Sequence, residues 1–179
     1  DPTPNVHPLT HAYIEAAGKL GLAHNHDFNA DTQEGVGVYQ LTTHKGRRMS
    51  AARAFLDPIR RRPNLKIVTN ALVTRVLFDG NRAIGTESEI NGLKHIFNAS
   101  REVILAGGAV NSPQLLQLSG IGPATLLKQH GIDVRMDNAN VGEHLEDHLG
   151  INYTYRVNVR TLNDELRPWW GKLKVGLQY

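Results

Sequence analysis

The chain has 179 residues, of which 40% are hydrophobic, enough for one globular domain or for parts of two. Its formal net charge is +3 with acidic and basic residues interspersed, so the charge demands neither a nucleic-acid partner nor a membrane surface. The absence of cysteine excludes disulfides, thiolate metal sites and cysteine nucleophiles, and no apolar stretch approaches the roughly 20 residues of a membrane-spanning helix.

The first third of the chain predicts two helices with a strand between them. Apolar spacing over residues 7–21 describes an amphipathic helix. Residues 36–43 alternate as in a strand of an antiparallel sheet, and a second helix is predicted over 51–59. His24 and His26 resemble a metal-binding pair, but nothing fixes them on one face and no third ligand is evident. We therefore predict no metal site.

The central segment predicts strands. Four short strand signals cover residues 66–69, 73–78, 83–89 and 93–97. The turn sequences Asp-Gly-Asn and Asn-Gly separate the last three, which predicts a three-stranded meander. An unbroken apolar run from Val103 to Ala106 then suits a strand that is buried on both faces, as in a parallel sheet covered by helices.

Gly107 and Gly108 follow that apolar run. They lead into a predicted helix, for which Asn111 or Ser112 would be the N-cap. Pro113 would occupy the first helical position, and Gly120 would end the helix. Such a turn lets backbone amides approach a phosphate or a cofactor closely. It could equally be a device for packing the helix on the sheet, because two glycines without G-x-G-x-x-G are a weak dinucleotide signal.

The last third predicts two helices and two strands. They are a helix over 123–131 with Leu126 and Leu127 inward, a strand over 132–136, a strand over 151–159 and a helix from Asn163 that carries two adjacent tryptophans. The aromatic surface of the tryptophans needs a partner. The chain starts without methionine and stops while apolar residues still recur. We interpret it as an internal piece of a longer polypeptide.

Two histidines in the last third, His144 and His148, would share a helical face. Zinc proteases with H-E-x-x-H need a glutamate directly after the first histidine, and Leu145 stands there instead. A protease mechanism therefore fails. We favour a structural hydrogen-bonding role for Asp147 and His148 over a catalytic one.

The run from Gly108 to Gly122 resembles the second signature of the glucose-methanol-choline (GMC) family of FAD-dependent oxidoreductases. Four features match that signature: the small residues, the Ser-Pro pair, the paired leucines and the closing Ser-Gly-Ile-Gly. The resemblance covers the chain from about Asp27 to His148, through the segments Gly46–Ala52, Arg62–Leu65, Thr69–Val73, Gly120–Pro123 and Val141–His148. Within this family, the segments Asp79–Gly85 and Val141–His148 resemble the choline-dehydrogenase-like branch most.

The resemblance implies a mixed α/β fold. It would comprise part of an FAD-binding doubly wound sheet with a β-meander, and part of a substrate domain built on an antiparallel sheet. The implied domain division is residues 1–64 in the substrate domain and connecting helices, 65–140 in the FAD-binding domain, and 141–179 returning into the substrate domain.

The resemblance also implies FAD as the cofactor. In GMC proteins the valine at the position of Val73 places its backbone against the adenine, and we predict Ala106, Gly107 and Gly108 as further cofactor contacts. No G-x-G-x-x-G occurs in the chain. The family's catalytic histidine would lie beyond Tyr179, so we name no catalytic residue and expect this piece alone to be inactive.

The implied function is oxidation of an alcohol CH–OH group by hydride transfer to flavin, with choline or another primary alcohol as substrate. The expected partners are that small molecule and the remainder of the polypeptide, not nucleic acid. Two alternatives stay open: an FAD-retaining lyase that cleaves cyanohydrins, and a degenerate, non-catalytic domain. The sequence does not distinguish an oxidase from a dehydrogenase, nor does it give the compartment.

Overall fold

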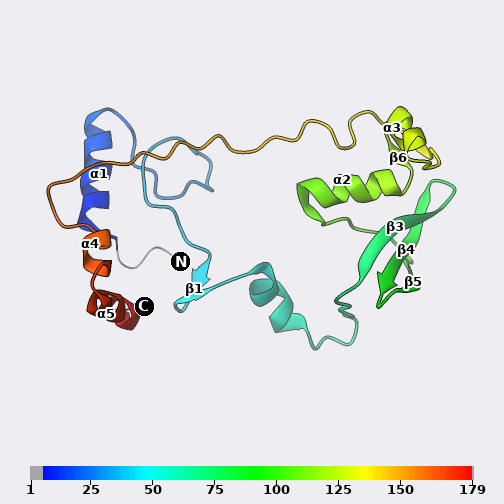
Figure 1. Cartoon of the computed structure of the whole chain (residues 1–179), viewed down its shortest axis with the longest axis horizontal. Helices are drawn as coiled ribbons and strands as arrows, with labels where there is room; N and C mark the ends of the chain where they lie inside the picture. The colour runs from blue at the N-terminus through cyan, green and yellow to red at the C-terminus, as the bar shows by residue number, and fades with distance from the viewer. Residues whose placement is uncertain (1–5, 179) are drawn as a thin grey trace. The chain divides into compact units, whose positions relative to one another are not determined.

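The computed structural model describes residues 6–178 and divides the chain into two compact units (Figure 1). One unit contains the residues up to 65 and those from 152 onward, and the other contains residues 66–151. Helices and strands occur together along the chain, so the predicted mixed α/β class is confirmed. No helix among the described residues is long and apolar enough to cross a membrane.

The first unit is mainly helical. The predicted N-terminal helix is confirmed as α1 (Pro8–Lys19), which His7 caps by accepting a hydrogen bond from the Leu9 amide. Thr161 caps the fourth α-helix through a reciprocal bond with Asp164. The remaining elements are β1 (Thr43–His44), β2 (Arg47–Arg48), the π-helical turn η1 (Ala52–Leu56), the 3₁₀ turn η2 (Asp57–Ile59), α4 (Leu162–Leu166) and α5 (Trp169–Gln178).

Two strands predicted in this unit are wrong. Residues 36–43 form only a single bridge, from Val36 to His24, before β1 begins. Residues 151–159 are not in a strand. Alternation describes which face of a strand would be buried, but a strand also needs a neighbour that pairs with its backbone. Among the described residues no ladder includes 37–42 or 151–159.

The second unit contains the predicted meander. Its strands are β3 (Leu72–Asp79), β4 (Arg82–Ile90) and β5 (Leu93–Asn98), paired antiparallel in that order. Two-residue turns connect them at Gly80–Asn81 and Asn91–Gly92, where the sequence predicted hairpins. Helix α2 (Gly108–Leu118) packs on β3.

Helix α2 begins earlier than predicted. Its N-cap is Gly107, so a cap at Asn111 or Ser112 is wrong, and Pro113 lies inside the helix. The Ser112 hydroxyl accepts a hydrogen bond from the Gly107 amide at 2.9 Å, which closes the turn ahead of the proline. Pro113 removes one amide from the helix without preventing the turn before it. The predicted end is confirmed, since α2 stops just before Gly120.

The rest of the second unit is a short strand–helix–strand segment. Strand β6 (Ile121–Gly122) and strand β7 (Met136–Asp137) pair in parallel, and α3 (Ala124–Gln129) connects them. Leu127 is buried as predicted, with 1% of its surface exposed, whereas Leu126 is 36% exposed. The strand predicted over 132–136 begins only at Met136.

Two other predicted strands of this unit are wrong. Residues 66–69 and 103–106 form no strand, and Ile104 is 77% exposed. A strand buried in a parallel sheet needs a neighbour on each side and helices on both faces. Within the described part of the chain no strand pairs with residues 103–106.

Candidate functional site

A cavity of about 470 Å³ lies between the start of β3 and helix α2. Three of the four predicted cofactor contacts, Val73, Ala106 and Gly107, line it, and Gly108 does not. Its other walls are mostly apolar, with a few polar side chains from α2 and β4. They are Ala71, Leu72, Thr86, Val103, Ile104, Leu105, Asn111, Ser112, Gln114, Leu115 and Leu118.

The pairing of β3 with β4 turns Val73 toward this cavity. Val73 pairs with Ser88 and Val76 pairs with Thr86, so three steps along β3 match two steps along β4. The register shift is a β-bulge at Thr74. Paired residues share a face of a sheet, and successive residues of a strand alternate between faces. The bulge therefore places Val73 and Val76 on the same face as Thr86, which also lines the cavity.

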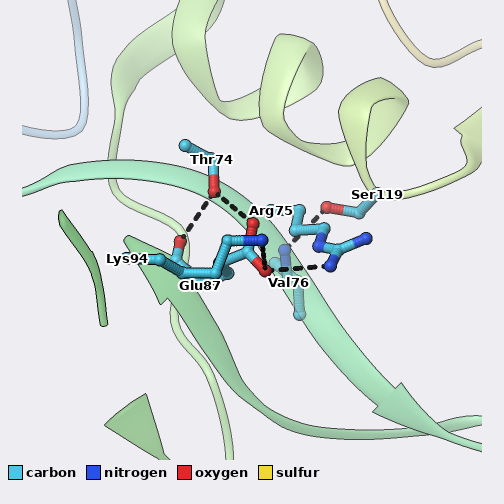
Figure 2. A network of polar contacts seen from close by, with 6 residues as sticks. All are labelled: Thr74, Arg75, Val76, Glu87, Lys94 and Ser119. Carbon is cyan, nitrogen blue, oxygen red and sulfur yellow. Dashed lines mark hydrogen bonds and ion pairs between the residues drawn. The ribbon is translucent and has the colours of Figure 1, made fainter. Parts of the chain in front are cut away.

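Helix α2 is tied to β3 through Ser119. The Ser119 hydroxyl accepts a hydrogen bond from the Val76 amide at 2.8 Å and donates one to the Leu115 carbonyl oxygen at 2.6 Å. Figure 2 shows the contact between Ser119 and Val76. Because Leu115 lines the cavity and Val76 belongs to the same strand as Val73, this hydroxyl ties the helix wall of the cavity to β3.

The opposite face of the sheet carries a polar network around Glu87 (Figure 2). Glu87 is 9% exposed. Its carboxylate lies 2.8 Å from the Arg75 guanidinium and 3.0 Å from the Lys94 ammonium. The Thr74 hydroxyl lies 3.2 Å from both Oε1 and the backbone carbonyl oxygen of Glu87. The hydrogen bonds from Arg75 and then Lys94 hold the pKa of Glu87 below its ordinary value.

The two glycines of the turn have different roles in the structure. The amide of Gly107 is already used, because it donates to the Ser112 hydroxyl. Gly108 has a φ of +84°, a left-handed conformation that favours glycine, and a Cβ at this position would meet no atom within 4 Å. The backbone conformation therefore explains a glycine at 108, and the space beside it is open.

A second cavity, of about 890 Å³, lies between α2 and residues 140–146. Ser112 and Gln114 line both cavities. The Gln117 side-chain amide donates to the Val141 carbonyl oxygen at 2.9 Å and holds this segment against the helix.

The predicted helical face shared by His144 and His148 is wrong, because residues 143–150 form no helix. His144 itself has a φ of +58°, outside the helical range. Over residues 6–178 no three His, Cys, Asp or Glu side chains come together in a way that could hold a metal ion.

Sequence reasoning missed the buried carboxylate of Glu87. A regular hairpin closed by Asp79 and Arg82 would pair Arg75 with Thr86, whereas Arg75 pairs with Glu87. A second register shift, between Leu77 and Phe78, produces this offset. The sequence does place Arg75 and Glu87, which carry opposite charges, on neighbouring predicted strands. Only the observed register shows that their side chains meet.

Comparisons with known proteins agree with this architecture. The GMC oxidoreductase family model matches residues 2–150. The chain is 47% identical over 175 residues to the mitochondrial choline dehydrogenase of Homo sapiens, covering 97% of this chain and 29% of that protein. It is 42% identical over 173 residues to an oxygen-dependent choline dehydrogenase of Brucella suis biovar 1, covering 96% of this chain and 31% of that protein.

The chain also resembles solved structures. One is the pyridoxine 4-oxidase from Mesorbium loti, with a TM-score of 0.64 and 33% identity over 76% of this chain and 27% of that one. Another is an FAD-dependent oxidoreductase from Chaetomium thermophilum, with a TM-score of 0.68 and 33% identity over 74% of this chain and 24% of that one. The chain spans 31% or less of the length of these four relatives. On the family match over most of its length, the chain belongs to the GMC oxidoreductase family.

Proposed function

We propose that this chain forms part of the FAD site of an enzyme that oxidises an alcohol CH–OH group. Choline or another primary alcohol is the proposed substrate, because the curated relatives described above are named choline dehydrogenases. The observation that carries the proposal is the meeting of Val73, Ala106 and Gly107 at one cavity, in a chain of this family.

The residues of the cavity fit part of an organic cofactor. A cavity of about 470 Å³ with mostly apolar walls and a few polar groups is typical of a small-molecule or cofactor site. The side chain of Val73 and the apolar residues around Ala106 would contact the faces of a ring of the cofactor, while backbone groups of β3 would reach its edge. Since the second cavity shares Ser112 and Gln114, a ligand larger than one cavity could contact both.

Gly108 is also proposed as a cofactor contact, but on different grounds from Val73, Ala106 and Gly107. It does not line the cavity, but the open space beside it gives a cofactor room to approach the backbone. The positive end of α2 points to the same turn, where a negatively charged group of the cofactor would be stabilised.

When bound, the flavin supplies the chemistry by accepting a hydride from the alcohol carbon. The contribution of this chain is to bind and orient the cofactor and to exclude water from it. We assign no catalytic residue here. In this proposal, the general base and the remaining cofactor contacts come from the rest of the polypeptide.

The two units correspond in this proposal to parts of two domains. Residues 66–151 would belong to the FAD-binding domain, and the residues before and after them to the substrate domain. The unit boundary lies between 151 and 152, whereas the boundary we predicted lies between 140 and 141. The functional assignment of the units stays a prediction.

Anaerobic reduction by an alcohol tests the proposed activity. We expect the purified full-length polypeptide to show the visible absorption of a flavin, and we expect choline or another primary alcohol to bleach it, because hydride transfer reduces the flavin. Absorption spectra recorded without oxygen, before and after addition of an alcohol panel, measure this. Tetramethylammonium is the matched control, since it keeps the cation of choline but has no oxidisable CH–OH group.

Three outcomes separate the open functions. Bleaching by an alcohol but not by tetramethylammonium supports the oxidoreductase. A bound flavin that no alcohol reduces would favour the lyase. A purified protein without flavin would favour the non-catalytic domain.

A further inference from the structure

Glu87 is a buried carboxylate that the proposed cofactor site does not use. It lies on the face of the sheet opposite to the cavity, since it pairs with Arg75 while its neighbour Thr86 lines the cavity. Burying a charge is costly unless partners compensate for it. Glu87 has three such partners, and two of them, Thr74 and Arg75, are consecutive residues of β3.

Those two residues form the β-bulge. In a bulge, two residues of one strand lie opposite one residue of the other. Here Thr74 and Arg75 lie opposite Glu87, and its carboxylate binds the side chains of both. The third partner, Lys94, reaches the same carboxylate from β5.

The bulge decides where Val73 points. Val76 is 6% exposed and pairs with Thr86, so it lies on the same face as that residue, which lines the cavity. Strict alternation would place Val73, three residues earlier, on the opposite face of the strand. The additional residue at Thr74 returns Val73 to the face of the cavity.

We infer that Glu87 is a positioning residue for the cofactor: with Thr74 it locks the bulge that presents Val73 to the cavity. This inference rests on the proposed function, since it assigns the cavity to FAD. The fixed bulge reduces the conformational freedom that binding would otherwise have to remove from β3.

Two substitutions in the full-length protein test the inference through the dissociation constant of FAD. Thr74→Val keeps the shape and the β-branching of threonine but removes the hydroxyl. Glu87→Leu removes the carboxylate at similar size. We expect each to raise the dissociation constant about tenfold, the size of effect that follows from losing a partly buried hydrogen bond. Thr74→Ser, which keeps a hydroxyl, is expected to restore affinity.

Lys94→Gln is the matched control. It removes an ion pair with Glu87 but leaves the contacts of the carboxylate with Thr74 and Arg75, so we expect FAD affinity to remain unchanged. Amide hydrogen exchange of residues 72–76 provides a readout that does not depend on flavin. Exchange should become faster in Thr74→Val and Glu87→Leu and should not change in Lys94→Gln.

The outcomes separate this inference from the proposed function. A wild-type protein that binds no FAD overturns both. If wild-type protein binds FAD and folded Thr74→Val keeps the same dissociation constant and the same exchange of residues 72–76, the positioning role alone is overturned. An equal loss of affinity in Lys94→Gln would also overturn it, because the effect would then follow charge and not the bulge.

Discussion

Gly120→Ala is expected to lower the free energy of unfolding of the unit formed by residues 66–151 by about 3 kcal/mol or more. Gly120 has a φ of +85°, and a Cβ at this position would lie 2.5 Å from the backbone carbonyl oxygen of Asp133. The carbonyl oxygen of Gly120 also accepts hydrogen bonds from the amides of Arg135 and Met136, at 2.8 and 3.1 Å. The backbone therefore cannot move away without breaking these contacts.

Gly131→Ala is the control for this prediction. Gly131 also has a positive φ, +67°, but a Cβ there would meet no atom within 4 Å. Its substitution should cost only the left-handed backbone penalty, about 1–2 kcal/mol. Chemical denaturation of the two variants beside wild-type protein measures the difference. Equal losses would show that the close approach of Asp133 to Gly120 contributes nothing.

The local parts of this fold were predictable from sequence. Short-range signals decide where a hairpin turns and where a helix stops, and those predictions were confirmed at Asn91–Gly92 and at Gly120. The start of α2 was wrong by several residues. The reason is the hydrogen bond from the Gly107 amide to Ser112, which uses a side chain from inside the helix to close the turn before it.

Predictions that depended on a distant partner were wrong more often. The apolar run 103–106 and the alternating segments 36–43 and 151–159 each show which residues would be buried in a strand. None of them specifies which strand would pair with it, and in the structure residues 37–42, 103–106 and 151–159 belong to no ladder. Pairing needs a second segment at the right distance, and periodicity within one segment does not encode that partner.

The candidate site was predictable only through the family resemblance. From the local sequence alone, the turn at Gly107 and Gly108 could be either a cofactor contact or a means of packing the helix on the sheet. Val73 was predicted because it occupies a family position, and the structure brings it together with Ala106 and Gly107 at one cavity. The bulge at Thr74 could not be predicted, because its register depends on a second shift further along the same hairpin.

Val73→Asp should weaken FAD binding about 100-fold, the largest effect on the cofactor that we expect from one substitution. The new carboxylate would face a cavity lined by Ala106 and other apolar residues. No cation lies among the residues that line this cavity, so the charge would have to be desolvated against the bound ring. The dissociation constant of FAD from the full-length protein measures the loss, and Val73→Ile, which stays apolar and β-branched, should bind nearly as wild-type protein does.

Leu93→Asp separates this effect from a general cost of placing aspartate in the meander. Leu93 begins β5, is 66% exposed and does not line the cavity. We expect Leu93→Asp to leave the affinity for FAD unchanged. If Val73→Asp also bound FAD with wild-type affinity, the cofactor could not occupy this cavity, and the assignments of Ala106 and Gly107 would fail with that of Val73. A selective loss in Val73→Asp would instead identify the strand wall of the cavity as a cofactor contact, because the two variants share the same chemistry and differ only in where the charge lies.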